Sequence, residues 1–297
     1  MGKASRIKQQ SAREKIAAQR EAARKAERRN RIMITGGSTL LVLVIVAVFI
    51  VIKLTQGSTS SPGNTSTTGT LLPASVSSQV TGVPVATLDR VGKGAIPSYT
   101  STPLSPASGA ALTSGGKPEM LYIGAEFCPY CAAMRWSMAV ALSRFGTLSP
   151  LHGIHSSATD TDPNTPTLTF YKTTYNSNYL TFTPVEVQTV SRAPLQSPTS
   201  AQNAIWAKYE PDPNTRGYPF IAFSNKFILE APIFDPGVLA GKSWSQVAAA
   251  LKDPTSPIAQ NVNGAANYIT GAICKMTNNQ PSNVCSSPAV QAVQSGL

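Results

Sequence analysis

The stretch EMLYIGAEFCPYCAAM, residues 119–134, places a short apolar run directly before two cysteines, Cys128 and Cys131, that lie three positions apart. A short, continuous apolar run is typical of a buried strand. Beyond the cysteines, apolar residues recur at spacings of three and four as far as Phe145, which predicts a helix from about Pro129. We therefore expect the two cysteines where a buried strand meets the first turn of a helix.

This placement suits a redox-active pair. Residues i and i+3 of a helix share a face, so both sulfurs can reach disulfide distance. Cys128 is expected at the helix N-terminus, where unpaired N–H groups and the macrodipole favour an anion and lower a thiol pKa. Cys131, one turn further on, is then the buried resolving thiol. Pro129 suits the first turn because its missing N–H would be unpaired there.

Two other interpretations of the pair stay open. An inert structural disulfide has the same spacing, and a zinc site would need two further ligands. The other cysteines, Cys274 and Cys285, are eleven positions apart, which does not match a zinc knuckle. They close a short polar loop, so we expect a structural disulfide between them. The strand–cysteine–helix context favours redox chemistry at Cys128 and Cys131, with no metal and no cofactor.

The N-terminal region predicts a membrane anchor. Residues 1–32 contain eleven Lys/Arg and three Glu, so they carry +8 of the net charge of +11. Residues 33–52 are uncharged, and twenty helical residues span about 30 Å, the hydrocarbon thickness of a bilayer. The run is longer than the core of a signal peptide. We expect a single-pass protein in the cell membrane, with a basic cytoplasmic arm and everything after the anchor outside.

The remaining chain divides by composition. Residues 53–84 are rich in Ser, Thr, Gly and Pro, which predicts a flexible linker. Residues 85–297 are expected to form one α/β extracytoplasmic domain. Within it, the alternating segment Leu168–Val190 predicts an inserted β-hairpin, and Ser224-Asn225 is expected to join a second hairpin. Most of the net positive charge lies in the first arm and no nucleic-acid-binding motif occurs, so we expect no nucleic-acid partner.

The motif AEFCPYC resembles the active-site turn of the thioredoxin superfamily. The segment RGYPFIAF is similar to its second element, a cis-proline that faces the cysteines at the start of a central strand. More closely, the chain resembles an uncharacterised membrane-anchored thioredoxin-like family of archaea and actinobacteria, through FCPYCAAMRW, FTPVEVQT, GYPFIAF and AICKMTNNQPSNVC. The resemblance implies a thioredoxin-like fold with Pro219 in the active site. It also implies that a substrate segment is positioned by Tyr218, Phe127, Pro129 and Tyr130.

One position departs from thioredoxin. The family's buried acid, six residues before the first cysteine, is replaced here by Tyr122. No basic residue lies between the cysteines to stabilise the Cys128 thiolate. Together these features predict an intermediate reduction potential, on the order of −180 to −230 mV.

The expected function is therefore that of a membrane-anchored extracytoplasmic thiol–disulfide oxidoreductase. Its clients would be exported proteins that contain cysteines, which it oxidises or shuffles. The redox partner would be a quinone-linked thiol oxidase of the membrane or an electron donor. Two alternatives stay open: a non-catalytic binding or assembly protein with the same fold, and a dedicated thiol reductant for one client, such as a cytochrome maturation factor.

Overall fold

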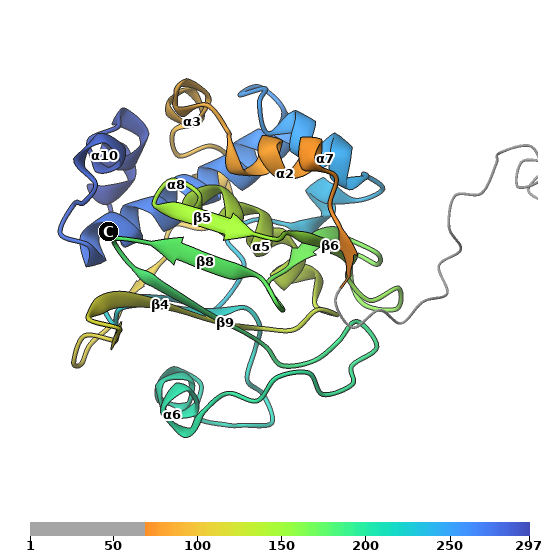
Figure 1. Cartoon of the computed structure of the whole chain (residues 1–297), viewed down its shortest axis with the longest axis vertical. Helices are drawn as coiled ribbons and strands as arrows, with labels where there is room; N and C mark the ends of the chain where they lie inside the picture. Colours follow the sequence, from red (N-terminus) through yellow and green to blue (C-terminus); the bar gives the residue numbers. More distant parts are fainter. Residues whose placement is uncertain (1–68) are drawn as a thin grey trace, which may run out of the picture. The chain divides into compact units, whose positions relative to one another are not determined.

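The computed structural model describes residues 69–297 (Figure 1). The predicted cytoplasmic arm 1–32, the predicted transmembrane helix 33–52 and the linker up to residue 68 lie outside the described residues. Within residues 69–297, none of the helices combines the length and the apolar character that crossing a bilayer requires.

A mixed sheet of six strands forms the centre of the domain. Five strands lie in the order β2 (Ser105–Pro106), β11 (Phe227–Leu229), β10 (Phe220–Phe223), β4 (Lys117–Gly124) and β3 (Thr113–Ser114). The sixth, β9 (Thr181–Glu186), pairs in parallel with β4, while β10 pairs with β4 and β11 in antiparallel fashion. The predicted buried strand before the cysteines and the hairpin at Ser224-Asn225 are both confirmed. The fold is thus a mixed α/β domain.

Helices cover both faces of this sheet. Helices α5 (Pro129–Leu142) and α8 (Pro257–Met276) pack together over one face, and α6 (Ser200–Tyr209) lies on the other (Figure 1). Successive residues of a strand point to opposite faces. Accordingly Met120 and Tyr122 of β4 belong to the core under α5 and α8, whereas Leu121 and Ile123 pack in a second cluster with Trp206 of α6. The apolar composition of β4 follows from this burial on both sides.

The other elements surround this centre. A three-stranded sheet has the order β1 (Thr70–Leu71), β6 (His152–His155) and β7 (Pro166–Thr169), and β5 (Gly146–Ser149) pairs with β8 (Thr174–Ser177). The remaining helices are α2 (Ala74–Thr81), α3 (Val85–Val91), α4 (Ile96–Tyr99), the 3-10 helix η1 (Pro236–Leu239), α7 (Trp244–Ala250), α9 (Ser282–Cys285) and α10 (Pro288–Gln294).

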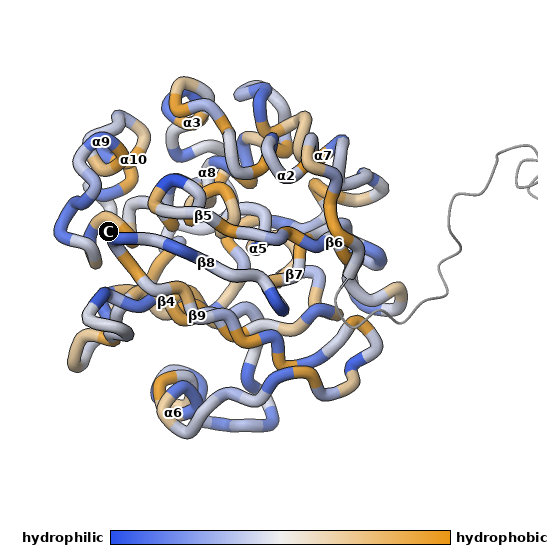
Figure 2. The backbone as a smooth tube through the Cα atoms, in the orientation of Figure 1, coloured by the Kyte–Doolittle hydropathy of each residue, from blue (hydrophilic) through white to orange (hydrophobic). Residues whose placement is uncertain are grey.

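The predicted hairpin Leu168–Val190 is wrong. The segment contains the second half of β7 and all of β8 and β9, which pair with β6, β5 and β4 in three separate sheets. The polar sequence YNSN in the middle of the segment, which suggested a turn, lies largely inside β8, which Figure 2 shows as a mostly hydrophilic strand. Alternation reports that a segment is extended, but it does not identify the neighbouring strand. Here β9 pairs with β4, and β8 pairs with β5.

The predicted flexible linker 53–84 is wrong for its last fifteen residues, 70–84, which fold onto the domain as β1 and α2. Leu72, Val76 and Val80 are buried in the main core. Val76 and Val80 lie four apart in α2 and share one helical face, and Leu72 lies just before the helix, so the three form one apolar stripe toward the core. The Ser, Thr, Gly and Pro content of the surrounding chain masked this apolar stripe. The folded domain therefore begins well before residue 85.

Candidate redox site

The two cysteines lie where the sequence places them. Strand β4 ends at Gly124, a short turn follows, and Cys128 is the N-cap residue of α5. Its sulfur accepts a hydrogen bond from the backbone N–H of Cys131, at 3.4 Å. Pro129 is buried at the first position of the helix, where it fixes the helix start. The predicted strand–cysteine–helix junction is confirmed.

The two thiols differ in their surroundings. Both are free, but Cys128 is 5% exposed and Cys131 is fully buried. A hydrogen bond from the Cys131 thiol, followed by backbone N–H groups and the Arg135 charge, lowers the Cys128 pKa against the opposing effect of burial. Burial raises the Cys131 pKa well above its usual range. Cys128 is thus suited to be the nucleophile and Cys131 the resolving thiol.

This difference predicts a selective alkylation pattern. In the reduced protein, iodoacetamide is expected to modify Cys128 first, because the thiolate is the reactive form and its lowered pKa makes it available at lower pH. The rate at Cys128 should rise as the pH passes through its pKa, below the value of an ordinary cysteine. Mass spectrometry between about pH 5 and about pH 9 measures this rise. Preferential modification of Cys131 in the folded protein would contradict the assignment.

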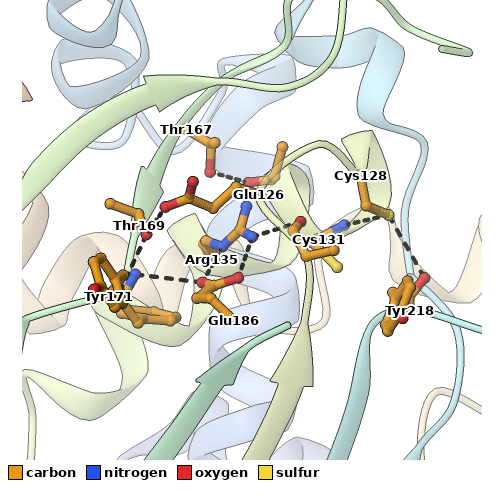
Figure 3. Close-up of polar contacts among 12 residues, drawn as sticks. Glu126, Cys128, Cys131, Arg135, Thr167, Thr169, Tyr171, Glu186 and Tyr218 are labelled. Carbon is orange, nitrogen blue, oxygen red and sulfur yellow. Dashed lines mark hydrogen bonds and ion pairs between the residues drawn. The ribbon is translucent and has the colours of Figure 1, made fainter. Parts of the chain in front are cut away.

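A second segment faces Cys128. The Tyr218-Pro219 peptide bond is cis, as the resemblance implied, and β10 begins at the next residue. The Cys128 thiol donates to the Tyr218 carbonyl oxygen at 3.8 Å (Figure 3). Residues 90 positions apart in the chain therefore meet at the reactive sulfur. The Tyr218 carbonyl is a backbone acceptor that an extended polypeptide lying beside Cys128 would meet.

Aromatic side chains form the surroundings of Cys128. Phe127 is only 8% exposed, with the Tyr218 ring edge-on at 6.2 Å and the Arg192 guanidinium 3.7 Å from its ring centre. Tyr218 and Tyr130 are partly exposed beside it. Of the residues predicted to position a substrate, Tyr130 and Tyr218 are thus accessible. Phe127 supports them from beneath.

Sequence reasoning missed a buried ion pair behind the cysteines. Arg135 of α5 donates from Nε and Nη2 to the two carboxylate oxygens of Glu186, at 2.8 and 2.7 Å, and Nη2 also donates to the Ala125 carbonyl oxygen (Figure 3). Both side chains are fully buried. The sequence feature that could have indicated this pair is Arg135, which lies one turn beyond Cys131 and is the only charged residue in α5. Its spacing of four places it on the same helical face as that cysteine.

No basic residue lies between the cysteines, but the structure adds a cation, Arg135, that acts on the Cys128 thiolate from one helical turn beyond Cys131. The Arg135 charge lowers the pKa of Cys128 and acts on Cys131 in the same direction. Because a lower thiol pKa stabilises the reduced pair, the argument for an intermediate potential loses one of its two premises. A further acid, Glu126, is buried nearby and accepts a hydrogen bond from the Thr169 hydroxyl at 2.6 Å. Burial raises the Glu126 pKa.

The remaining two cysteines form the expected disulfide. Cys274 at the end of α8 and Cys285 in α9 are bonded, with Cα atoms 5.6 Å apart, and both are buried. Closing a loop of this length stabilises a fold by about 3 kcal/mol in the chain-entropy account. The bond attaches the C-terminal helices to α8. In the described part of the chain, no three His, Cys, Asp or Glu side chains gather as metal ligands would.

Comparison with known proteins identifies the family. Residues 104–275, more than half of the chain, match a family described as a domain of unknown function, DUF929. The chain belongs to the DUF929 family. The match includes both cysteines of the CPYC motif, the Arg135–Glu186 pair and Pro219, and it ends between the partners of the disulfide. No curated protein and no solved structure gives a significant match. The DUF929 description names no activity, so the function has to be argued from the site.

Proposed function

We propose that this DUF929 protein is a membrane-anchored thiol–disulfide oxidoreductase that oxidises or shuffles cysteines of exported proteins. The observation that carries the proposal is the asymmetry of the two thiols. Cys128 caps a helix with a lowered pKa, and Cys131 is fully buried one turn away with a raised pKa. An inert disulfide has no need for such a difference, whereas a nucleophile and its resolving partner depend on it.

The proposal includes a thioredoxin-like fold. Its support is the order of elements around the cysteines: a buried strand, the CPYC turn and a long helix, and later in the chain a strand that starts directly after Pro219. That strand, β10, lies between β11 and β4 in the sheet, so the Tyr218 carbonyl reaches the end of β4 where Cys128 lies. This is the position that the resemblance assigned to the second element of the active site.

The proposed thiol–disulfide exchange conserves electrons and protons between the thiols of the client and the cysteine pair. In the oxidising direction, a client thiolate attacks Cys128 of the Cys128–Cys131 disulfide, and Cys131 leaves as a thiolate. A second client thiolate then attacks the client sulfur of the mixed disulfide, and Cys128 leaves. The client loses two electrons and two protons, and the cysteine pair gains them. A quinone-linked thiol oxidase of the membrane would return the pair to the disulfide. The reverse sequence, supplied by an electron donor, reduces or shuffles client disulfides.

The proposed location rests on the sequence of the first 52 residues. A basic arm before an uncharged stretch of twenty residues directs the N-terminus to the cytoplasm. A green fluorescent protein fused after Leu297 is therefore expected to be dark, because that reporter fails to mature when it is exported unfolded. Alkaline phosphatase fused at the same place should be active, because it needs disulfides that form outside the cytoplasm. A bright, phosphatase-inactive fusion would place the domain inside and remove the exported clients from the proposal.

Trapping of mixed disulfides tests the function directly. Full-length Cys131→Ala protein, expressed in cells, should accumulate disulfide-linked adducts at Cys128, since no second thiol resolves them. Non-reducing gels and mass spectrometry identify the captured proteins, and the double variant Cys128→Ser/Cys131→Ala is the matched control. Exported proteins with cysteines should dominate the adducts. A single recurrent client would favour the dedicated-reductant alternative. Absence of adducts beyond the control would leave a binding or assembly role in place of catalysis.

A further inference from the structure

A buried tyrosine hydroxyl lies beside the resolving thiol. Tyr122 is fully buried on β4, and its side chain runs along the strand over Gly124. A Cβ atom at Gly124 would lie only 2.0 Å from the Tyr122 hydroxyl oxygen. The absence of a side chain at Gly124 is therefore what makes room for this hydroxyl. Burial raises the Tyr122 pKa well above its usual range, and the Cys131 thiol adds to this effect, but the hydroxyl makes no hydrogen bond of normal geometry.

A second buried donor near the same thiol is also unpaired. Arg135 uses Nε and Nη2 on Glu186 and Ala125, but its Nη1 has no partner. The guanidinium lies 6.0 Å from the centre of the Tyr122 ring, and its charge lowers the Cys131 pKa against the larger effect of burial. Buried polar groups without a partner are uncommon in native proteins, because each has lost its hydrogen bond to water. Neither group makes a hydrogen bond of normal geometry in the resting dithiol, so both have a donor to offer an anion formed at Cys131.

We infer that Tyr122 and Arg135 form a donor site for the Cys131 thiolate, the anion that exists only while the mixed disulfide is formed or resolved. The inference rests on the proposed function. During resolution, the Cys131 thiolate attacks the Cys128 sulfur of the mixed disulfide, the Cys128–Cys131 bond forms, and the client thiolate leaves with the electron pair. The proton lost by Cys131 balances the one that the client thiol gains. In the oxidising direction the same donors stabilise Cys131 as the leaving thiolate.

Tyr122 acts here as a donor and keeps its proton. Burial raises its pKa well above the usual range, and the Arg135 charge opposes this only in part. A neutral hydroxyl can donate one hydrogen bond to a thiolate, and the guanidinium adds a charged donor. Tyr122 thus stands where the thioredoxin superfamily has an acid, but with the opposite role: it stabilises the thiolate and does not remove the proton.

A two-step reaction with 5,5′-dithiobis(2-nitrobenzoic acid) separates this role from nucleophilic attack. The reduced full-length protein should release one coloured thiolate when Cys128 attacks the reagent, and a second when Cys131 resolves the adduct. In Tyr122→Phe the first release is expected at the wild-type rate. The second release should be about ten- to a hundredfold slower, the effect of losing one hydrogen bond to an anion. Tyr175→Phe removes another tyrosine hydroxyl, one that bonds the Leu142 carbonyl oxygen, and should change neither step.

The outcomes distinguish the inference from the function it rests on. An unchanged second release in Tyr122→Phe, or a slowed first release, overturns the donor site. Absence of a second release in the wild-type protein overturns the proposed function itself. Tyr122→Phe should fold, because it deletes a hydroxyl that has no partner. Gly124→Ala is the second variant: it displaces the hydroxyl without removing it, and it should slow the second release and spare the first.

Discussion

Arg135→Met is expected to lower the free energy of unfolding by about 3–5 kcal/mol, the largest stability effect we predict for a single side chain in this domain. The substitution keeps much of the volume in the core but leaves the Glu186 carboxylate fully buried without its two charged donors. The Ala125 carbonyl oxygen, in the turn before Cys128, loses a donor as well. Denaturant unfolding followed by circular dichroism measures the change.

The chain offers a matched control for this prediction. Arg192 forms an ion pair with Asp160 at 2.6 Å, but its side chain is 51% exposed. Arg192→Met should therefore cost no more than about 1 kcal/mol, since water screens the pair. The double variant Arg135→Met/Glu186→Leu should recover most of the loss, because both buried charges are then absent. Equal costs for Arg135→Met and Arg192→Met would show that Glu186 is not left as an unpaired buried charge.

Cys128→Ser is expected to abolish the reaction with oxidised glutathione, with a fall in rate of about a thousandfold or more. At a pH at which the Cys128 thiol ionises, a serine hydroxyl stays protonated. The remaining thiol, Cys131, is fully buried with a raised pKa. Intact-protein mass spectrometry of the reduced protein after exposure to oxidised glutathione gives the rate. The substitution exchanges sulfur for oxygen at a helix N-cap, where serine is a favoured residue, so the fold should be retained.

Cys131→Ser is the matched comparison. It keeps the Cys128 nucleophile and should accumulate glutathione on Cys128, because the resolving thiol is absent. In the wild-type protein the glutathione adduct on Cys128 should be a short-lived intermediate, and the final product should be the Cys128–Cys131 disulfide. Glutathione attached to Cys131 in Cys128→Ser at the wild-type rate would reverse the roles of the two cysteines.

Local features of the chain were accessible to sequence reasoning. The apolar run before Cys128 predicts β4 because a strand buried on both faces needs apolar residues at every position. The periodic stripe after it predicts α5, and the CPYC motif lies at their junction. The polar loop between Cys274 and Cys285 predicts their disulfide, which is confirmed. Each of these predictions depends on neighbours within about twenty residues, for which sequence spacing and spatial proximity coincide.

Pairings between distant segments were not accessible in the same way. The alternation in Leu168–Val190 is real, but β8 and β9 pair with β5 and β4 and not with each other. The Ser, Thr, Gly and Pro content of the linker concealed the apolar residues Leu72, Val76 and Val80. Their burial shows only in the folded core. In both cases the sequence reports the local conformation, while the partner depends on which surfaces the rest of the fold leaves uncovered.

The sequence by itself determined the cysteine pair and its place at a helix N-terminus, and it predicts Cys128 as the nucleophile, because all three follow from the geometry of one strand–helix junction. The tertiary structure alone decided what surrounds that pair. It brings Glu186 from the end of β9 onto Arg135, Tyr218 from beyond α6 onto Cys128, and the Tyr122 hydroxyl over Gly124 toward Cys131. These groups set the charge and hydrogen bonding of the two sulfurs. Parallel pairing of β4 with β9 places Gly124 in register with Glu186, a contact across 62 residues that local spacing does not encode.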